Sequence, residues 1–317
     1  MITQASLIGS VVGAIVVSEI LAPGPLGALR GTLTRVAEAS APVVLILPGS
    51  GPTDRDGNNP FGIQAATYRH LSDDLAAEGV TSIRIDKRGM FGSASAVKDA
   101  NAVTIEDYVD DVRSWVDVAQ RETGAKCVWL LGHSEGGLVA LAASDRVPDI
   151  CGLVLVATAG RNMGEVLKDQ LRSNPANAEL LPRAMTAIDE LSAGRRVAAE
   201  HMPPALAALL PEQVQGFLIS AFRLDPRQLV AAVKKPVLIL QGRRDIQVGV
   251  KDAQALHDAN ASSHLVLLSD TNHVLKQVDT DDVSANLMTY ANATLPLAPY
   301  VARAIASFVK TSPNQAQ

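Results

Sequence analysis

The hydrophobic residues of this chain gather in short continuous runs that are rich in valine, isoleucine and leucine, and each run ends in a loop with glycine or polar residues. Runs without polar alternation are typical of strands that are covered on both faces of a sheet. We therefore predict strands at residues 43–47, 81–85, 127–131, 152–157, 236–240 and 264–268.

The segments between these runs have the pattern of amphipathic helices. Residues 65–79 end on a glycine, and residues 104–124 begin with Thr104 and Asp107 at the spacing of a capping box and end on Gly124. Strands that alternate with helices along the chain are typical of a mostly parallel sheet. The fold class predicted from the sequence is therefore α/β, with helices on both faces of the sheet.

The first 36 residues depart from this alternation. They lack helix signals and contain several prolines and glycines, which predicts antiparallel strands joined by turns. The apolar stretch within residues 1–20 is short, is interrupted by glycines and follows no positive segment, so it fits neither a signal peptide nor a membrane helix. We expect an edge strand there.

Residues 161–230 also depart from the alternation of strands and helices, because they contain no run that resembles a strand. Their amphipathic segments are separated by prolines, which predicts a helical insertion. We expect this insertion to form a lid over the carboxyl edge of the sheet. The core domain would then consist of residues 1–160 and 231–317.

Composition and charge narrow the classes of partner. The net charge is -5 and no run of lysine or arginine forms a basic stripe, so we expect no binding to nucleic acid and none to membranes. Cys127 and Cys151 each begin an apolar run and are too few for a disulfide framework. They predict two reduced, buried thiols in a cytoplasmic protein.

The most informative motif is Gly132-His133-Ser134-Glu135-Gly136, which lies between a predicted strand and a segment with helical pattern. In a strand-turn-helix elbow the serine has a strained backbone and its neighbours must be small. The following helix also directs its amides toward the serine oxygen. This context favours Ser134 as a nucleophile over an ordinary glycine-rich turn.

A serine hydroxyl needs a base that accepts its proton. Among the six histidines, His273 follows a predicted strand and lies in a loop at the edge where Ser134 should emerge. His133 is held in the elbow, and the others fall in helices or begin a strand: His70, His201, His257 and His264. We therefore expect His273 to be the base.

The imidazole in turn needs an acceptor that fixes its tautomer. Asp245 follows the predicted strand at 236–240, and the order serine, aspartate, histidine along the chain favours it over Asp270. The alternative for Asp245 is a surface ion pair with Arg243 or Arg244.

Attack on a carbonyl carbon also requires amide donors for the negative oxygen that develops. One donor should be the backbone N–H of Glu135, directly after the nucleophile. The second should come from the glycine-rich loop after residues 43–47, where Ser50 is the expected donor and Gly51 the alternative.

With these residues assembled, the chain resembles the α/β-hydrolase superfamily over nearly its whole length. It is most similar to bacterial carboxylesterases of the serine-aminopeptidase-like group, whose oxyanion loop corresponds here to GSGPTDRDG at 49–57. The resemblance implies a triad of Ser134, Asp245 and His273 with no metal and no organic cofactor. Many relatives have His-Gly where this chain has Pro48-Gly49, but the expected donor is a backbone amide, so activity should survive this difference. Asp54, Arg55 and Asp56 should brace that loop.

The sequence thus predicts a serine hydrolase that cleaves short- to medium-chain carboxylic esters through an acyl-enzyme. A thioesterase or acyltransferase would use the same triad, a peptidase would need anchoring charges in the lid, and a receptor of the same fold would not need the triad. Glu165, Glu179 and Glu190 in the lid have the pattern of solvated helix faces. The sequence leaves a homodimer open.

Overall fold

The computed structural model describes residues 14–312, which form one eight-stranded sheet in the order β1-β2-β4-β3-β5-β6-β7-β8. Strands β3 to β8 are parallel to their neighbours among themselves, whereas β2 is antiparallel to both β1 and β4. The strands are β1 (Val16–Ala22), β2 (Leu29–Arg35), β3 (Val43–Leu47), β4 (Thr81–Ile85), β5 (Val128–His133), β6 (Ile150–Val156), β7 (Val237–Gly242) and β8 (His264–Leu268). The prediction of a mostly parallel α/β sheet is confirmed.

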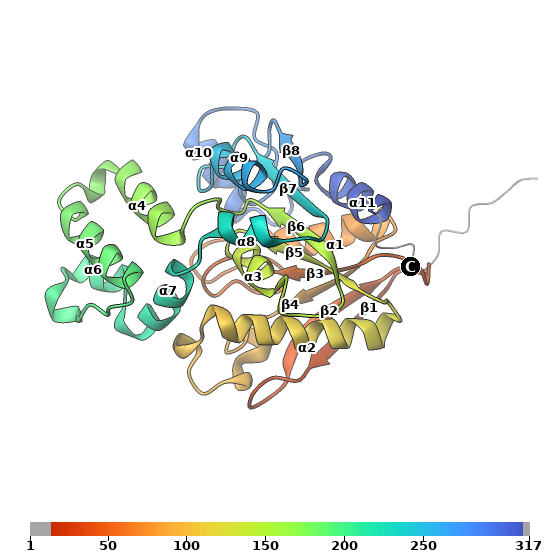
Figure 1. Cartoon of the computed structure of the whole chain (residues 1–317). Helices are drawn as coiled ribbons and strands as arrows, with labels where there is room; N and C mark the ends of the chain where they lie inside the picture. Colours follow the sequence, from red (N-terminus) through yellow and green to blue (C-terminus); the bar gives the residue numbers. More distant parts are fainter. Residues whose placement is uncertain (1–13, 313–317) are drawn as a thin grey trace, which may run out of the picture.

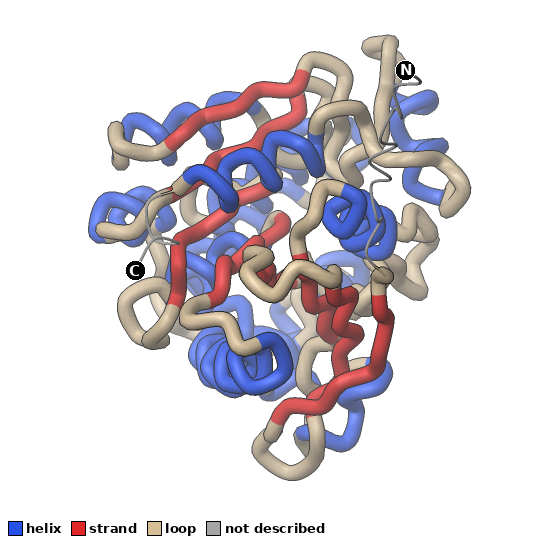
Figure 2. The backbone as a smooth tube through the Cα atoms, turned by 90° about the vertical axis from the view of Figure 1, so that its right-hand side faces the viewer, coloured by secondary structure: helices blue, strands red, loops and turns tan. Residues whose placement is uncertain are grey.

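Helices cover both faces of this sheet (Figures 1 and 2). The helices of the core are α1 (Thr67–Ala77), α2 (Ile105–Thr123), α3 (Glu135–Ala143), α9 (Val250–Ala259), α10 (Val283–Met288) and α11 (Val301–Thr311). Short 3-10 helices are η1 (Phe91–Ala96), η2 (Ala100–Ala102), η3 (Pro175–Asn177), η4 (Ala199–His201), η5 (Glu212–Val214) and η6 (Thr289–Ala291).

Strand β3 illustrates why continuous hydrophobic runs occur in this chain. Val43, Leu45 and Leu47 point to the face that packs against α2 and α3, and Val44 and Ile46 point to the face covered by α1 and α11. All five residues are buried. Both faces therefore require apolar side chains, which removes the polar alternation of a half-exposed strand.

The ends of α2 follow the local signals in the sequence. The Thr104 hydroxyl accepts a hydrogen bond from the amide of Asp107, and the Asp107 carboxylate accepts one from the amide of Thr104 at 2.9 Å. Gly124 ends the helix with a φ of 76°, in the left-handed region that favours glycine. The predicted capping box and glycine cap are confirmed.

Between β6 and β7 the chain forms helices without an intervening strand. They are α4 (Met163–Ser173), α5 (Leu181–Ser192), α6 (Pro204–Leu209), α7 (Gln215–Phe222) and α8 (Pro226–Ala232). Helices α4 to α7 project to one side of the sheet in Figure 1, beyond the carboxyl ends of the parallel strands. One contact to the core joins α7 to the start of α2, where the Ser220 hydroxyl accepts from the amide of Ile105 at 3.1 Å.

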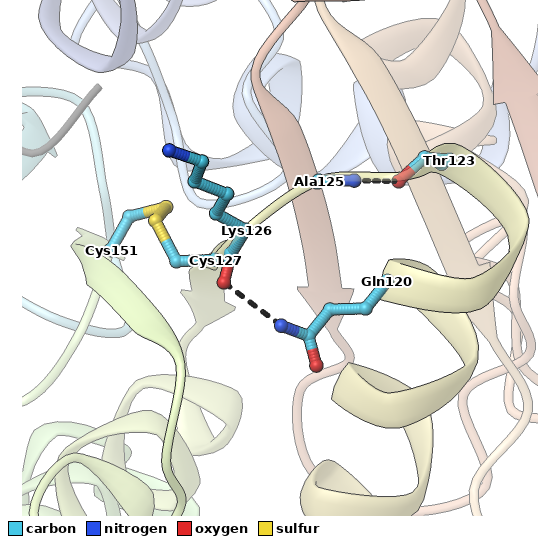
Figure 3. Close-up of a disulfide and its surroundings, with 6 residues drawn as sticks. All are labelled: Gln120, Thr123, Ala125, Lys126, Cys127 and Cys151. Carbon is cyan, nitrogen blue, oxygen red and sulfur yellow. Dashed lines mark hydrogen bonds between the residues drawn. A yellow bond between two sulfur atoms is a disulfide. The ribbon is translucent and has the colours of Figure 1, made fainter. Parts of the chain in front are cut away.

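The two cysteines form a disulfide, so the prediction of two reduced thiols is wrong (Figure 3). Cys127 directly precedes β5 and Cys151 lies in β6, and the pairing of these strands places their Cα atoms 5.2 Å apart. Each cysteine begins an apolar run, but the sequence does not say that the two runs become neighbouring strands in this register. Because disulfides persist mainly in oxidising compartments, the two cysteines do not support the predicted cytoplasmic location.

The disulfide lies at the amino end of β5, whereas Ser134 follows the carboxyl end of the same strand. The turn before Cys127 is also held by hydrogen bonds, from the Gln120 amide to the Lys126 carbonyl and from the Ala125 amide to the Thr123 hydroxyl (Figure 3). A crosslink that closes a loop of this size typically stabilises a fold by about 3 kcal/mol. Its contribution therefore concerns stability rather than the chemistry at Ser134.

The sequence predicted an edge strand within residues 1–20, and residues 1–13 of this segment lie outside the described residues. Within the described part, β1 is the edge strand of the sheet and pairs in antiparallel register with β2. Across residues 14–312, no helix combines the length and the apolar character needed to cross a membrane.

Candidate active site

The serine elbow forms where β5 meets α3. Ser134 has φ 54° and ψ -119°, a left-handed conformation that is unusual for a residue with a side chain. Its neighbours must be glycines, because a Cβ on Gly132 would lie 2.2 Å from the Gly136 carbonyl oxygen, and one on Gly136 would lie 2.2 Å from that of Leu47. The half-buried serine is therefore held in a fixed, strained position at the amino end of α3.

Asp245 and His273 come together from the loops after β7 and β8. Their hydrogen bond joins His273 Nδ1 to Asp245 Oδ2 at 2.8 Å, and the Asp245 side chain is fully buried. Asp245 is also fixed by the Gln241 side chain and by the amides of Gln247 and Val248. A carboxylate held in this way keeps the proton of His273 on Nδ1 and the Nε2 atom free to accept one.

The surroundings of Asp245 favour its charged form. Burial by itself raises the pKa of a carboxyl group, but here the charge of His273 and the hydrogen bonds from His273, Val248 and Gln247 outweigh it. The pKa of Asp245 therefore lies below its ordinary value. The lowered pKa favours the negative carboxylate as the partner of the imidazole.

Ser134 and His273 line the same small cavity, but no hydrogen bond joins them. Among the described residues, neither the Ser134 hydroxyl nor His273 Nε2 has a hydrogen-bond partner. Such contacts are often long in a free enzyme and shorten when substrate binds. Asp270, the competing acid, is exposed and makes no bond to the imidazole.

The residues expected to donate to the oxyanion line one cavity together with Ser134. Ser50, Gly51 and Glu135 line the same larger cavity as the serine. Glu135 is the first residue of α3, so its amide has no acceptor within the helix. The amide of Ser50 has no acceptor among the described residues either.

The loop that carries Ser50 is braced by charged side chains, as the sequence predicted. The Asp54 carboxylate accepts from the amides of Asp56 and Asn58 at 2.9 and 2.8 Å. Arg55 pairs with the buried Asp86, and the Asp56 carboxylate pairs with Arg84. The two ion pairs tie the loop to the end of β4.

A chain of hydrogen bonds connects the three loops of the site. The amide of Gly49 donates to Tyr68 Oη, the Tyr68 hydroxyl contacts His133 Nδ1, and His133 Nε2 contacts the backbone carbonyl of His273, each at 2.9 Å. A carbonyl only accepts, so His133 carries its proton on Nε2 and accepts the Tyr68 proton on Nδ1. The chain therefore fixes the tautomer of His133 and ties the loop at Gly49 to the loop that carries His273.

A buried ion pair lies beside this chain. Lys87 Nζ donates to the carbonyl of Gly49 at 2.7 Å and lies 3.5 Å from Glu135 Oε1, and both side chains are buried. Burial lowers the pKa of Lys87, and the neighbouring Glu135 carboxylate opposes this effect. The pair holds the loop at Gly49 against the start of α3.

Replacement of His133 by glutamine should reduce the acid sensitivity of the fold. Burial, and next the neighbouring His273, lower the pKa of His133 from 6.5 to about 3, while the hydrogen bond to His273 and the charge of Asp245 oppose this. Between these values only the unfolded chain binds the proton, so the free energy of unfolding falls as the pH decreases, by up to about 1.4 kcal/mol per pH unit.

Urea unfolding at several values between pH 7 and pH 4 measures this effect. Glutamine keeps an N–H that can reach the His273 carbonyl but does not titrate, so the variant should lose stability less steeply than the wild type. Identical slopes in both proteins would contradict a neutral, buried His133.

The larger cavity has a volume of about 400 Å³ and opens beside Ser134. Side chains from α4, α6, α7 and α8 supply most of its apolar wall: Met163, Val166, Leu167, Leu209, Phe217, Leu218, Phe222 and Pro226. Glu135 is the one ionisable residue among those that line it in the described structure, and its carboxylate faces Lys87. The cavity therefore suits an uncharged, apolar group.

Comparison with solved structures identifies the architecture. The esterase Pf2001 of Pyrococcus furiosus superposes with a TM-score of 0.56 at 15% sequence identity, covering 94% of this chain and 93% of that chain. This protein has the α/β-hydrolase fold. The elbow after β5 and the loops after β3, β7 and β8 lie at the carboxyl edge of the sheet, where sites form in such folds.

Sequence comparisons add proteins to which this chain is similar. A model of the serine aminopeptidase S33 family matches residues 61–202, which include Ser134 but neither Asp245 nor His273. Esterase EstD of Thermotoga maritima is 25% identical over 245 residues, or 74% of this chain and 54% of that esterase. A monoacylglycerol lipase of Mycolicibacterium smegmatis is 25% identical over 213 residues, or 65% of this chain and 75% of that lipase. The chain spans about half the length of EstD.

The sequence did not single out Tyr68, Lys87 or Gln247. Tyr68 lies on the buried face of α1, where a tyrosine hydroxyl needs a partner, and this was the available signal. Gln247 lies two residues after Asp245, and it lines both cavities beside Ser134. Lys87 lies in the loop after β4, and only the packing shows that its ammonium group is buried.

Proposed function

We propose that this protein is a carboxylesterase that uses Ser134 as nucleophile, His273 as base and Asp245 as the acid that orients it. The observation that carries the proposal is the 2.8 Å hydrogen bond from His273 to the buried Asp245, beside a cavity that also contains the strained serine of the elbow. A carboxylate, an imidazole and an accessible hydroxyl are the groups that nucleophilic acyl transfer requires.

In the first half of the reaction His273 Nε2 takes the proton of the Ser134 hydroxyl while the oxygen attacks the ester carbonyl. The tetrahedral oxyanion accepts hydrogen bonds from the amides of Glu135 and Ser50, with Gly51 as the alternative donor. The imidazolium then gives its proton to the leaving alcohol. Water, activated by the same imidazole, attacks the acyl-enzyme and releases the acid.

The proposed acyl site is the 400 Å³ cavity, with helices α4 to α8 acting as the lid at residues 161–230. A cavity of this size, walled by aliphatic side chains and two phenylalanines, favours short to medium acyl chains. The printed names of the relatives, an esterase and a monoacylglycerol lipase, agree with ester substrates.

The same cavity argues against the peptidase named by the family model. An aminopeptidase needs a carboxylate that receives the charged amino group of its substrate. Glu165, Glu179 and Glu190 do not line the cavity; Glu165 pairs with Lys168 and Glu190 with Arg195. Glu135, which does line it, is paired with Lys87.

A substrate series tests this proposal. The protein should hydrolyse p-nitrophenyl esters with highest kcat/KM for short to medium acyl chains, because longer chains exceed the cavity. It should not release p-nitroaniline from aminoacyl p-nitroanilides. Turnover of the anilides with no turnover of the esters would contradict the proposal and favour the peptidase.

A further inference from the structure

Two cavities of different character meet at Ser134. The larger is apolar, whereas the smaller has a volume of about 100 Å³ and lies between the oxyanion loop, α1 and the base. Polar side chains of the smaller cavity are Ser50, Thr53, Asn59, Thr67, Tyr68 and Gln247. Ser134 lines both cavities, but His273 lines only the smaller one.

The position of His273 assigns a different part of an ester to each cavity. In acyl transfer the imidazole must reach the oxygen of the leaving alcohol, because it protonates that oxygen as the bond to the acyl carbon breaks. The alcohol therefore leaves on the side of His273, in the smaller cavity. The acyl group is left to the apolar cavity on the other side of Ser134.

The smaller cavity also presents polar atoms that the described chain does not satisfy. Asn59 Oδ1 is held by the amides of Phe61 and Ile63 at 2.9 and 3.2 Å, and the Nδ2 of this half-buried side chain bonds to no acceptor within residues 14–312. The exposed Gln247 donates from Nε2 to Tyr290 Oη at 3.1 Å, and its Oε1 bonds to no donor among the described residues. The exposed Ser50 hydroxyl likewise bonds to none of them, so water solvates both atoms when the cavity is free. An alkyl group that displaces water from this donor and this acceptor does not replace the lost hydrogen bonds. Its binding is therefore weaker than that of a group with a hydroxyl.

The volume favours a small alcohol. The smaller cavity has about 100 Å³, against about 400 Å³ for the apolar one, so it suits the smaller of the two parts of an ester. This suits a glycol or a similar alcohol with one or two further hydroxyl groups.

We propose that the smaller cavity is a subsite for a small hydroxylated alcohol, so that the preferred substrates are esters of an apolar acid with an alcohol of the glycol type. This inference rests on the proposed esterase function. In the step concerned, the bond from Ser134 Oγ to the acyl carbon forms, the bond from that carbon to the alcohol oxygen breaks, and the proton taken from Ser134 passes through His273 to the alcohol. Water later completes the hydrolysis, so atoms and protons balance.

The test compares two esters of one acid whose alcohols have equal numbers of heavy atoms, 2-hydroxyethyl hexanoate and propyl hexanoate. The wild type should favour the hydroxyethyl ester by at least about tenfold in kcat/KM, since only its alcohol satisfies the polar wall. Gln247→Met, which removes the free acceptor at similar size, should reduce this ratio several-fold.

A variant of the other cavity serves as the control. Phe217→Leu alters the acyl wall and should change the rates of both esters by the same factor, because the acid is identical. The ratio of the two rates is insensitive to a general loss of folded protein.

The outcomes separate the inference from the function on which it rests. Equal rates, or a preference for the propyl ester, with p-nitrophenyl esters still hydrolysed, would overturn the alcohol subsite and leave the esterase standing. An unchanged ratio in Gln247→Met would also overturn it. Failure of all the esters to react would overturn the inference and the proposed function together.

Discussion

Replacement of Ser134 by alanine is expected to lower kcat for ester hydrolysis by about 10⁶-fold. The elbow holds this hydroxyl in a left-handed conformation at the start of α3, beside the imidazole of His273 and the amides expected to bind the oxyanion. No acyl-enzyme forms without it, and only the weak catalysis of the oxyanion donors is left. Steady-state rates on a short p-nitrophenyl ester measure the effect.

A second serine of the same helix region provides the control. The Ser144 side chain caps α3 by a hydrogen bond to the Leu141 carbonyl at 2.8 Å and does not line either cavity. Ser144→Ala should cost a modest amount of stability and keep the activity. If Ser134→Ala retained more than a few per cent of the wild-type rate, Ser134 would not be the nucleophile.

Replacement of Asp245 by asparagine is expected to lower kcat by about 10⁴-fold. The carboxylate accepts the proton of His273 Nδ1 at 2.8 Å, whereas an asparagine amide can donate there instead and stabilise the opposite tautomer. His273 Nε2 would then carry a proton and could not take one from Ser134. The backbone bonds from Gln247 and Val248 to the side-chain oxygen can persist, so the loop should keep its shape.

Asp270→Asn is the matched control for this variant. Asp270 lies three residues before His273, but its side chain is exposed and makes no contact with the imidazole. Its replacement should change the rate less than twofold. A large loss of rate in Asp270→Asn together with a small loss in Asp245→Asn would mean that Asp270, and not Asp245, orients His273.

The fold was predictable to the extent that local signals decided it. Strands buried on both faces require continuous apolar runs, so the bounds of β3, β4 and β8 agree with the runs in the sequence. The caps of α2 depend on Thr104, Asp107 and Gly124, which lie close together along the chain. The loops that follow parallel strands meet at one edge, and for this reason Asp245 and His273 come together although 28 residues separate them.

Features that depend on which strands become neighbours were not predictable. The disulfide needs β5 beside β6 in a particular register, and each cysteine alone has the context of a buried thiol. The contact of Tyr68 with His133 likewise joins residues 65 positions apart through the packing of α1 on the sheet. The division of the site into an apolar and a polar cavity depends on the packing of the helices after β6, which the amphipathic pattern alone does not specify.

The most direct measurement is the intact mass of the wild-type protein after incubation with a fluorophosphonate, followed by mapping of the modified peptide. Our account predicts one adduct per chain, located on Ser134 and absent from Ser134→Ala, because only a serine activated by His273 attacks the phosphorus. No adduct, or an adduct on another residue, would contradict the account and mean that Ser134, His273 and Asp245 do not act together as a triad.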